Sequence, residues 1–133
     1  MKPLYLLPLV PLLFAPLVHA DQCDDATTQA QMNQCIDQRH KAADAELNAV
    51  YQQITQRLKS NPDAKKLLVS AQRAWLGFRD AECTFAASRT LGGSAYPMVV
   101  ADCVTTQNVA RTQALKVYLA CDEGDLGCPV PAQ

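Results

Sequence analysis

The chain has 133 residues, of which 49% are hydrophobic, and a formal net charge of −1 at neutral pH. This length suits one domain and is too short for two of ordinary size. The near balance of charges lacks the basic surplus of a nucleic-acid-binding domain, so no nucleic-acid partner is expected.

Residues 1–20 have the three-part layout of a secretory signal peptide. A short positive start, Met1-Lys2, precedes an apolar run from Leu4 to Val18, and a small residue, Ala20, ends the segment. The run is shorter than the roughly 20 residues of a membrane-spanning helix, and prolines interrupt it. We therefore expect residues 1–20 to be cleaved off and the remainder, without a membrane anchor, to be periplasmic or secreted.

Six cysteines follow this segment: Cys23, Cys35, Cys83, Cys103, Cys121 and Cys128. An even number behind an export signal indicates disulfides, because that compartment is oxidising. Their spacing in the sequence is compatible with many pairings. The alternative is a zinc site, but no CxxC pair is present and His40 is isolated, so neither a metal nor another cofactor is expected.

The apolar pattern predicts two long helices in the first part of the mature chain. The first runs from near Thr28 to near Ser60, where no glycine or proline occurs and apolar residues recur at helical spacing. The second begins at Pro62 and ends near Thr90. Its expected inward stripe is Leu68, Ala71, Trp75, Phe78, Glu82 and Phe85.

A third helix is expected from Pro97 to about Ala120. Its apolar positions are Val99, Val104, Val109, Leu115 and Leu119. Because short connections make neighbouring helices antiparallel, the predicted fold is all-α, an antiparallel bundle of three long helices stapled by disulfides. The domain covers residues 21–121, and residues 122–133 form a C-terminal tail.

The bundle geometry favours one set of disulfides. Cys83 and Cys103 lie at similar distances before and after the Gly92-Gly93 turn, and so at matching heights on adjacent helices. Cys35 is near the same end of the bundle, whereas Cys121 ends the third helix at the other. The favoured pairs are Cys23–Cys35, Cys83–Cys103 and Cys121–Cys128.

Several segments together resemble one known family. They are residues 32–35, 43–48, 71–83 and 92–94, with Tyr51, Arg111 and Leu115. Over about Cys23 to Cys121 the chain resembles the LprI-like lysozyme-inhibitor family of exported bacterial domains. The resemblance implies an exported protein-binding module that inhibits lysozyme. The chain departs from the mycobacterial lipoprotein that gives the family its name in lacking a lipoprotein site and a second domain.

A loop and an acidic segment form the candidate binding site. Its residues are Gly92, Gly93, Ser94 and Tyr96 in the loop and Asp21, Asp24 and Asp25 in the acidic segment. The loop could enter an enzyme cleft, and the acidic residues could steer a basic lysozyme toward it. The alternatives are a glycine-containing helix connection and ordinary solvated acidity. The bundle places both segments at one end, which is the only support for inhibition from the residues themselves.

The remaining conspicuous residues are interpreted as structural. Trp75 and Arg79 share a helix face, so we expect Trp75 in the core, with Arg79 and Asp80 bound to polar groups on other helices, Arg111 among them. Glu82 is expected to be paired or at the rim. No nucleophile or catalytic motif is found, so an enzyme is not expected. The alternative function is a structural or chaperone-like envelope protein that does not contact lysozyme.

Overall fold

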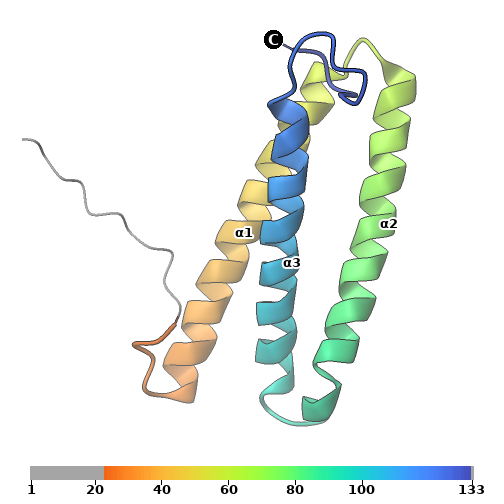
Figure 1. Ribbon diagram of the computed structural model, residues 1–133. Helices are drawn as coiled ribbons and strands as arrows, with labels where there is room; N and C mark the ends of the chain where they lie inside the picture. The colour runs from red at the N-terminus through yellow and green to blue at the C-terminus, as the bar shows by residue number, and fades with distance from the viewer. Residues whose placement is uncertain (1–22, 133) are drawn as a thin grey trace, which may run out of the picture.

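The computed structural model describes residues 23–132, and within them it contains three α-helices and no strand (Figure 1). α1 spans Gln29–Arg57, α2 spans Pro62–Ala86 and α3 spans Tyr96–Leu119, with a short 3₁₀ helix, η1, at Ser88–Thr90. The predicted all-α class is confirmed. The expected signal peptide and Asp21 lie outside the described residues. None of the described helices is both long and apolar enough to cross a membrane.

Local capping residues determine where α1 and α2 begin. The Thr28 hydroxyl accepts a hydrogen bond from the Gln31 amide at 3.2 Å, and the Gln31 side chain accepts one from the Thr28 amide at 3.1 Å. Asn61 caps α2 by accepting from the Ala64 amide at 3.1 Å, with Pro62 in the first turn. α2 ends at Ala86 rather than near Thr90, because the chain tightens there into η1.

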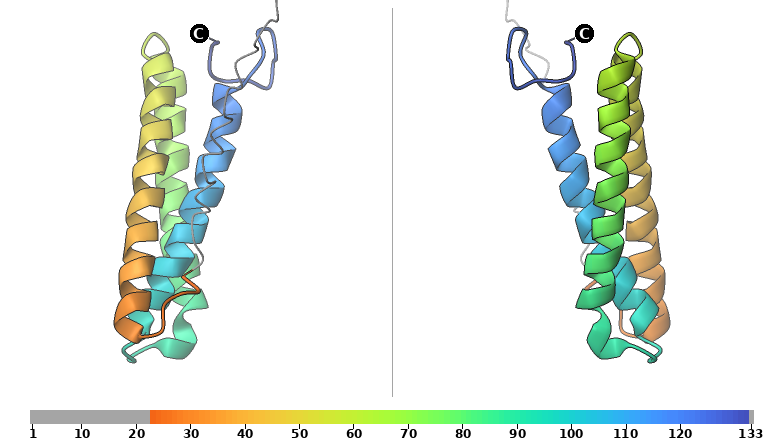
Figure 2. Two further views of the ribbon diagram at one scale, coloured as in Figure 1. Left: turned by 90° about the vertical axis from the view of Figure 1, so that its left-hand side faces the viewer. Right: turned by 90° about the vertical axis from the view of Figure 1, so that its right-hand side faces the viewer.

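Successive helices run the length of the molecule in alternating directions (Figure 1). α1 packs chiefly against α3, and α2 also lies against α3 but less extensively. The turn between α1 and α2 lies at the same end of the molecule as the C-terminal tail, as the side views also show (Figure 2). α3 is therefore the central element of the packing.

The apolar core lies near the tail end of the bundle. Its buried members are Leu47, Val50, Ile54, Leu58, Leu115 and Val130. Val130 belongs to the C-terminal tail outside the expected domain, yet it is only 3% exposed. The tail therefore covers the core formed by α1 and α3.

The predicted inward stripe of α2 is wrong in part. Trp75 and Leu68 pack against the core. By contrast, Phe78 and Phe85 are 56% and 74% exposed, and Ala71 is also exposed. The inward side of α2 passes through Leu68, Trp75 and the fully buried Cys83, so Phe78 and Phe85 lie on another side of the helix.

The predicted apolar positions of α3 also need correction. Leu115 is buried, but Val109 is 47% exposed. The other buried residues of α3 are polar, namely Thr105, Asn108 and Thr112. The hydroxyls of Thr105 and Thr112 donate to the carbonyls four residues earlier, at 2.7 and 2.8 Å, so their burial leaves no unpaired hydroxyl.

All six cysteines form disulfides, and the pairs are those that the bundle geometry favoured. The Cα–Cα distances are 5.9 Å for Cys23–Cys35, 5.5 Å for Cys83–Cys103 and 5.7 Å for Cys121–Cys128. The first attaches the segment before α1 to that helix, the second joins α2 to α3, and the third closes the tail. Two of the three bonds, Cys23–Cys35 and Cys83–Cys103, lie toward the end of the bundle that carries the Gly92-Gly93 loop.

Candidate functional site

One end of the molecule brings together the two segments that the sequence singled out (Figure 1). We call it the loop end. It comprises the segment before α1, the start of α1, η1, the loop at residues 91–95 and the start of α3. The described acidic residues Asp24 and Asp25 are exposed in a turn there, held by the Cys23–Cys35 disulfide.

The loop depends on its two glycines. Gly92 has a φ of +79°, which L side chains rarely adopt. A Cβ on Gly93 would lie 3.1 Å from the Thr90 carbonyl oxygen. Ser94 follows as an exposed residue, and Tyr96 is a half-buried residue that begins α3. The glycines thus form the helix connection that the sequence offered as an alternative, and they leave Ser94 exposed to solvent.

The loop end offers hydrogen-bond donors. The N-cap of α3, Ala95, supplies no side-chain hydrogen bond, so the amides of the first turn lack a side-chain acceptor. The Ser94 hydroxyl makes no hydrogen bond with the described residues, whereas the Gly93 amide donates to the Thr90 carbonyl at 2.9 Å. Pro97 has no N–H, and the Tyr96 amide donates to the Gly93 carbonyl at 3.2 Å. The Met98 amide, which has no acceptor among the described residues, and the Ser94 hydroxyl are therefore the donors left for an anionic group such as a carboxylate.

A shallow depression of about 300 Å³ lies beside the loop. Ser94 and Pro97 line it on the α3 side, and Asp37 and His40 line it from α1. The Nδ1 atom of His40 is buried and has no hydrogen-bond partner among the described residues. The sequence did not predict that Ser94 and His40 line one depression, because their proximity depends on how α1 packs against α3.

A second depression, of about 440 Å³, includes Asp24 and shares Ile36 and Met98 with the first. Arg39 also lines it, with its Nη1 atom 3.5 Å from Oδ1 of Asp102. On the neighbouring turn of α1, Lys41 Nζ lies 2.7 Å from Oδ2 of Asp37. The sequence indicated an acidic segment without basic residues.

Basic side chains from α1 lie beside this segment. They neutralise Asp37 and Asp102 in part. Asp24 and Asp25 form no salt bridge with the described residues and carry the remaining negative charge of this end. Asp21, the third proposed acidic residue, lies outside the described residues.

A polar cluster surrounds Trp75 between α2 and α3. The guanidinium carbons of Arg79 and Arg111 lie 5.5 and 5.7 Å from the centre of its ring. Arg79 Nη1 donates to Asn108 Oδ1 at 3.2 Å, and Arg111 Nε donates to Gln72 Oε1 at 3.0 Å. Both arginines are thus bound within the bundle, as the structural interpretation predicted.

Asp80 does not bind Arg111. It binds its own neighbour Arg79, whose Nη2 lies 2.7 Å from Oδ1 of Asp80. Asp80 therefore binds within its own helix and not, as expected, a polar group on another helix. Glu82 is half-buried and forms no salt bridge with the described residues. No group of three His, Cys, Asp or Glu side chains that could hold a metal occurs in the described part of the chain.

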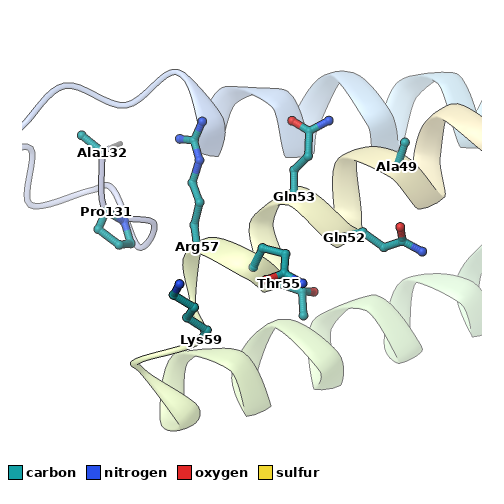
Figure 3. Close-up of a pocket in the computed structure, with 9 residues that line it drawn as sticks. Ala49, Gln52, Gln53, Thr55, Arg57, Lys59, Pro131 and Ala132 are labelled. Carbon is teal, nitrogen blue, oxygen red and sulfur yellow. The ribbon is translucent and has the colours of Figure 1, made fainter.

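The opposite end carries a larger open depression of about 830 Å³ (Figure 3). Gln52, Gln53 and Arg57 line it from α1, and Pro131 and Ala132 line it from the tail. Arg57 extends toward the end of α3, where its Nη1 donates to the Leu119 carbonyl at 2.9 Å (Figure 3). The lining of this depression mixes neutral polar, apolar and basic residues, and Arg57 already has a structural partner.

Comparison with known proteins finds similarity along most of the chain. The profile of the family described as Lysozyme inhibitor LprI matches residues 20–115. A protein of Rhizobium meliloti (strain 1021), named Uncharacterized protein R02472, is 36% identical over 105 residues, covering 71% of this chain and 76% of that protein. Uncharacterized protein YecT of Escherichia coli (strain K12) is 31% identical over 108 residues, covering 71% of this chain and 67% of its own length. No solved structure matches.

Proposed function

The chain belongs to the family described as Lysozyme inhibitor LprI, and from this membership we propose that it is a protein-binding module that inhibits a lysozyme through its loop end. The family is of an inhibitor type, not a known enzyme family, and its name indicates a protein partner. Family and disulfides together suggest an extracytoplasmic protein. We propose the periplasm or the cell exterior as its location, with residues 1–20 as the cleaved signal.

The observation that carries the proposal is the coincidence of an exposed loop and exposed acidic residues at one end (Figure 1). Lysozymes are glycosidases with two carboxyl groups in an open cleft. The loop at residues 91–95 is narrow, and Ser94 is exposed on it. Its hydroxyl and the Met98 amide in the first turn of α3 would donate hydrogen bonds to a cleft carboxylate. Gly92, Gly93, Ser94 and Tyr96 are the residues that we assign to this contact.

The acidic residues would act at longer range. Lysozymes are usually basic proteins, so Asp24 and Asp25, with Asp21, would attract them and orient the approach. Asp24 and Asp25 are exposed, so the effect of their charges should appear in the association rate and weaken with salt. The loop and the acidic residues therefore have separable roles.

The direct test is lysis of bacterial cell walls by lysozymes of several structural types, with and without the purified oxidised protein. Inhibition of at least one type is expected, with little inhibition by a variant that carries Ser94→Arg and Tyr96→Ala. The matched control is Gln52→Arg, which lies in the depression at the opposite end and should inhibit like the wild type. If the wild type neither inhibits nor binds any of the lysozymes, the proposed function is wrong.

The alternative is a structural or chaperone-like envelope protein without lysozyme contact. A pull-down distinguishes the two if the immobilised protein is offered a lysozyme mixture and, separately, an envelope extract. Capture of lysozyme, lost in the Ser94→Arg and Tyr96→Ala variant, supports the inhibitor. Capture of envelope proteins alone, unchanged in that variant, supports the alternative.

A further inference from the structure

α2 carries an apolar stripe on its outer side. Its members are Leu67, Ala71, Ala74, Phe78, Ala81 and Phe85, all exposed. The three large side chains are 72%, 56% and 74% exposed for Leu67, Phe78 and Phe85. The spacing alternates between four and three residues, which is the heptad pattern of a helix that packs along another helix. We call this set the outer stripe.

We propose that the outer stripe binds the outer stripe of a second copy of this chain, with the two α2 helices antiparallel about a twofold axis beside Leu76. This self-association goes beyond the proposed function and does not depend on lysozyme binding. The inward side of α2, with Trp75 and Cys83, faces the bundle and would keep its contacts.

The first support is the match of side-chain sizes about that axis. Leu67 of one copy would lie opposite Phe85 of the other, and Phe78 opposite Ala74 of the other. Ala71 would then face Ala81, so two small residues meet between the larger pairs. Each layer joins an a-type with a d-type position, as antiparallel helix pairs require, and large side chains beside alanines can interdigitate.

Gly77 provides the second support. It lies in the middle of α2, where glycine disfavours the helix relative to alanine. A Cβ built at this position meets nothing within 4 Å, so packing inside the chain does not require the glycine. In the antiparallel pair, Gly77 lies next to the axis on the same flank as Ser70 and Thr84. Three small residues on that flank would let the two backbones approach closely.

The third support is the distribution of charge along α2. Its first half carries three exposed cations, Lys65, Lys66 and Arg73, against one carboxylate, Asp63. Its second half carries two carboxylates, Asp80 and Glu82, against one cation, Arg79, so the halves have opposite net charge. Antiparallel pairing brings Arg73 of one copy level with Asp80 of the other, and Lys66 near the negative C-terminal end of the other α2. Parallel pairing would place like charges together. The charges therefore favour the antiparallel arrangement.

The interface is one helix pair and is smaller than the roughly 1,600 Å² of a standard protein–protein interface. A reversible, concentration-dependent dimer is therefore expected. Sedimentation velocity over a wide range of concentrations measures it directly with the oxidised protein. The wild type should rise from the mass of one chain to that of two.

Phe78→Glu tests the stripe, because it places a charge against Ala74 of the other copy. It should weaken dimerisation by about 100-fold while circular dichroism stays unchanged, since Phe78 is exposed in the single chain. The control is Val117→Glu, an exposed valine of α3 outside the stripe (66% exposed), which should dimerise like the wild type. A wild type that stays monomeric throughout, or a Phe78→Glu variant that dimerises normally, overturns the proposal. If the wild type is monomeric and Phe78→Glu loses binding to lysozyme or to lipid vesicles, the outer stripe binds another partner. That outcome also overturns the proposal.

Introduced cysteines test the direction of the helices. Ala71→Cys mixed with Ala81→Cys should form a disulfide between copies, because these positions face each other in the antiparallel pair. Neither variant alone should crosslink, since like positions would be about 15 Å apart along the axis, beyond the reach of a disulfide. Peptide mapping checks that the three native disulfides remain. Efficient crosslinking of either variant alone would indicate a parallel pair and would overturn the proposal.

Discussion

The Nη1 atom of Arg79 on α2 donates a hydrogen bond to Oδ1 of Asn108 on α3 across 3.2 Å. Asn108 is fully buried, and its Nδ2 atom has no partner among the described residues. The side chain of Arg79 is 15% exposed and lies over the Trp75 ring. The middle of α2 is thus attached to α3 by polar contacts in place of a continuous apolar seam.

Arg79→Ala should lower the free energy of unfolding by about 1–3 kcal/mol, because it removes a hydrogen bond from a charged donor. The buried Oδ1 atom of Asn108 would then lack a partner, as its Nδ2 atom already does. Urea denaturation measures the change. Lys59→Ala, an exposed site near the end of α1, serves as the control and should stay within about 0.5 kcal/mol of wild type. Equal stability of Arg79→Ala and wild type would show that the contact contributes nothing.

Trp75→Ala should cost about 2–3 kcal/mol, at or below the lower end of the range for a fully buried tryptophan. The side chain is half-buried against the core and lies beside two guanidinium groups, so truncation loses both packing and cation–π contacts. Trp75 is the only tryptophan, so unfolding must be followed by circular dichroism. A variant with unchanged melting temperature would exclude a structural role for this side chain.

The disulfides should differ in their contribution to stability. Replacing Cys83 and Cys103 by alanine should cost about 3 kcal/mol, because that bond spans 20 residues. Replacing Cys121 and Cys128 should cost about 2 kcal/mol, since that bond spans only 7. Thermal unfolding of both double variants beside wild type gives the order, and a reversed order would contradict the loop-length argument.

Val130→Ala should cost about 1–2 kcal/mol, because the side chain is buried with the residues of the core. Leu126→Ala is the matched control in the same tail, since Leu126 is fully exposed. It should change stability by less than about 0.5 kcal/mol. Similar effects of the two substitutions would show that the tail does not cover the core in solution.

The two parts of the proposed lysozyme site should differ kinetically. Replacing Asp24 and Asp25 by asparagine, together with Asp21, should slow association, and the loss should shrink as salt rises. Ser94→Ala or Tyr96→Ala should speed dissociation, because those groups would be buried in the cleft. Binding kinetics at two salt concentrations, beside melting curves, separate the effects. If the variants associate and dissociate at wild-type rates with a lysozyme that binds the wild type, the binding site lies elsewhere on the protein.

Local signals in the sequence sufficed for the starts of α1 and α2, and the geometry of the predicted bundle sufficed for the disulfide pairs. Thr28, Asn61 and Pro62 mark helix starts through short-range hydrogen bonds and backbone geometry, which a sequence displays directly. The orientation of α2 could not be predicted in the same way. Leu68 and Trp75 on one side, and Leu67 and Phe78 on another, give two apolar stripes, and periodicity alone does not decide which one faces the bundle.

The buried face of α3 shows a second limit. Asn108 and Thr112 look like surface residues in a sequence, but the Thr112 hydroxyl is satisfied within its own helix and Asn108 receives Arg79 from α2. The proximity of the loop to the acidic segment was predicted from bundle geometry, whereas the meeting of Ser94 with His40 was not. Their position at one depression depends on side-chain packing between distant segments.

The position of Val130 in the core affects how the chain can fold during synthesis. Its neighbours Leu47, Val50 and Ile54 leave the ribosome about eighty residues earlier, together with the rest of α1. Until the tail arrives, these apolar side chains lack one of their covers, and the long sequence separation makes their final pairing slow for a helical protein. The nascent protein therefore passes through a stage with an open, apolar surface on α1, which is the stage at which a holding chaperone would bind it.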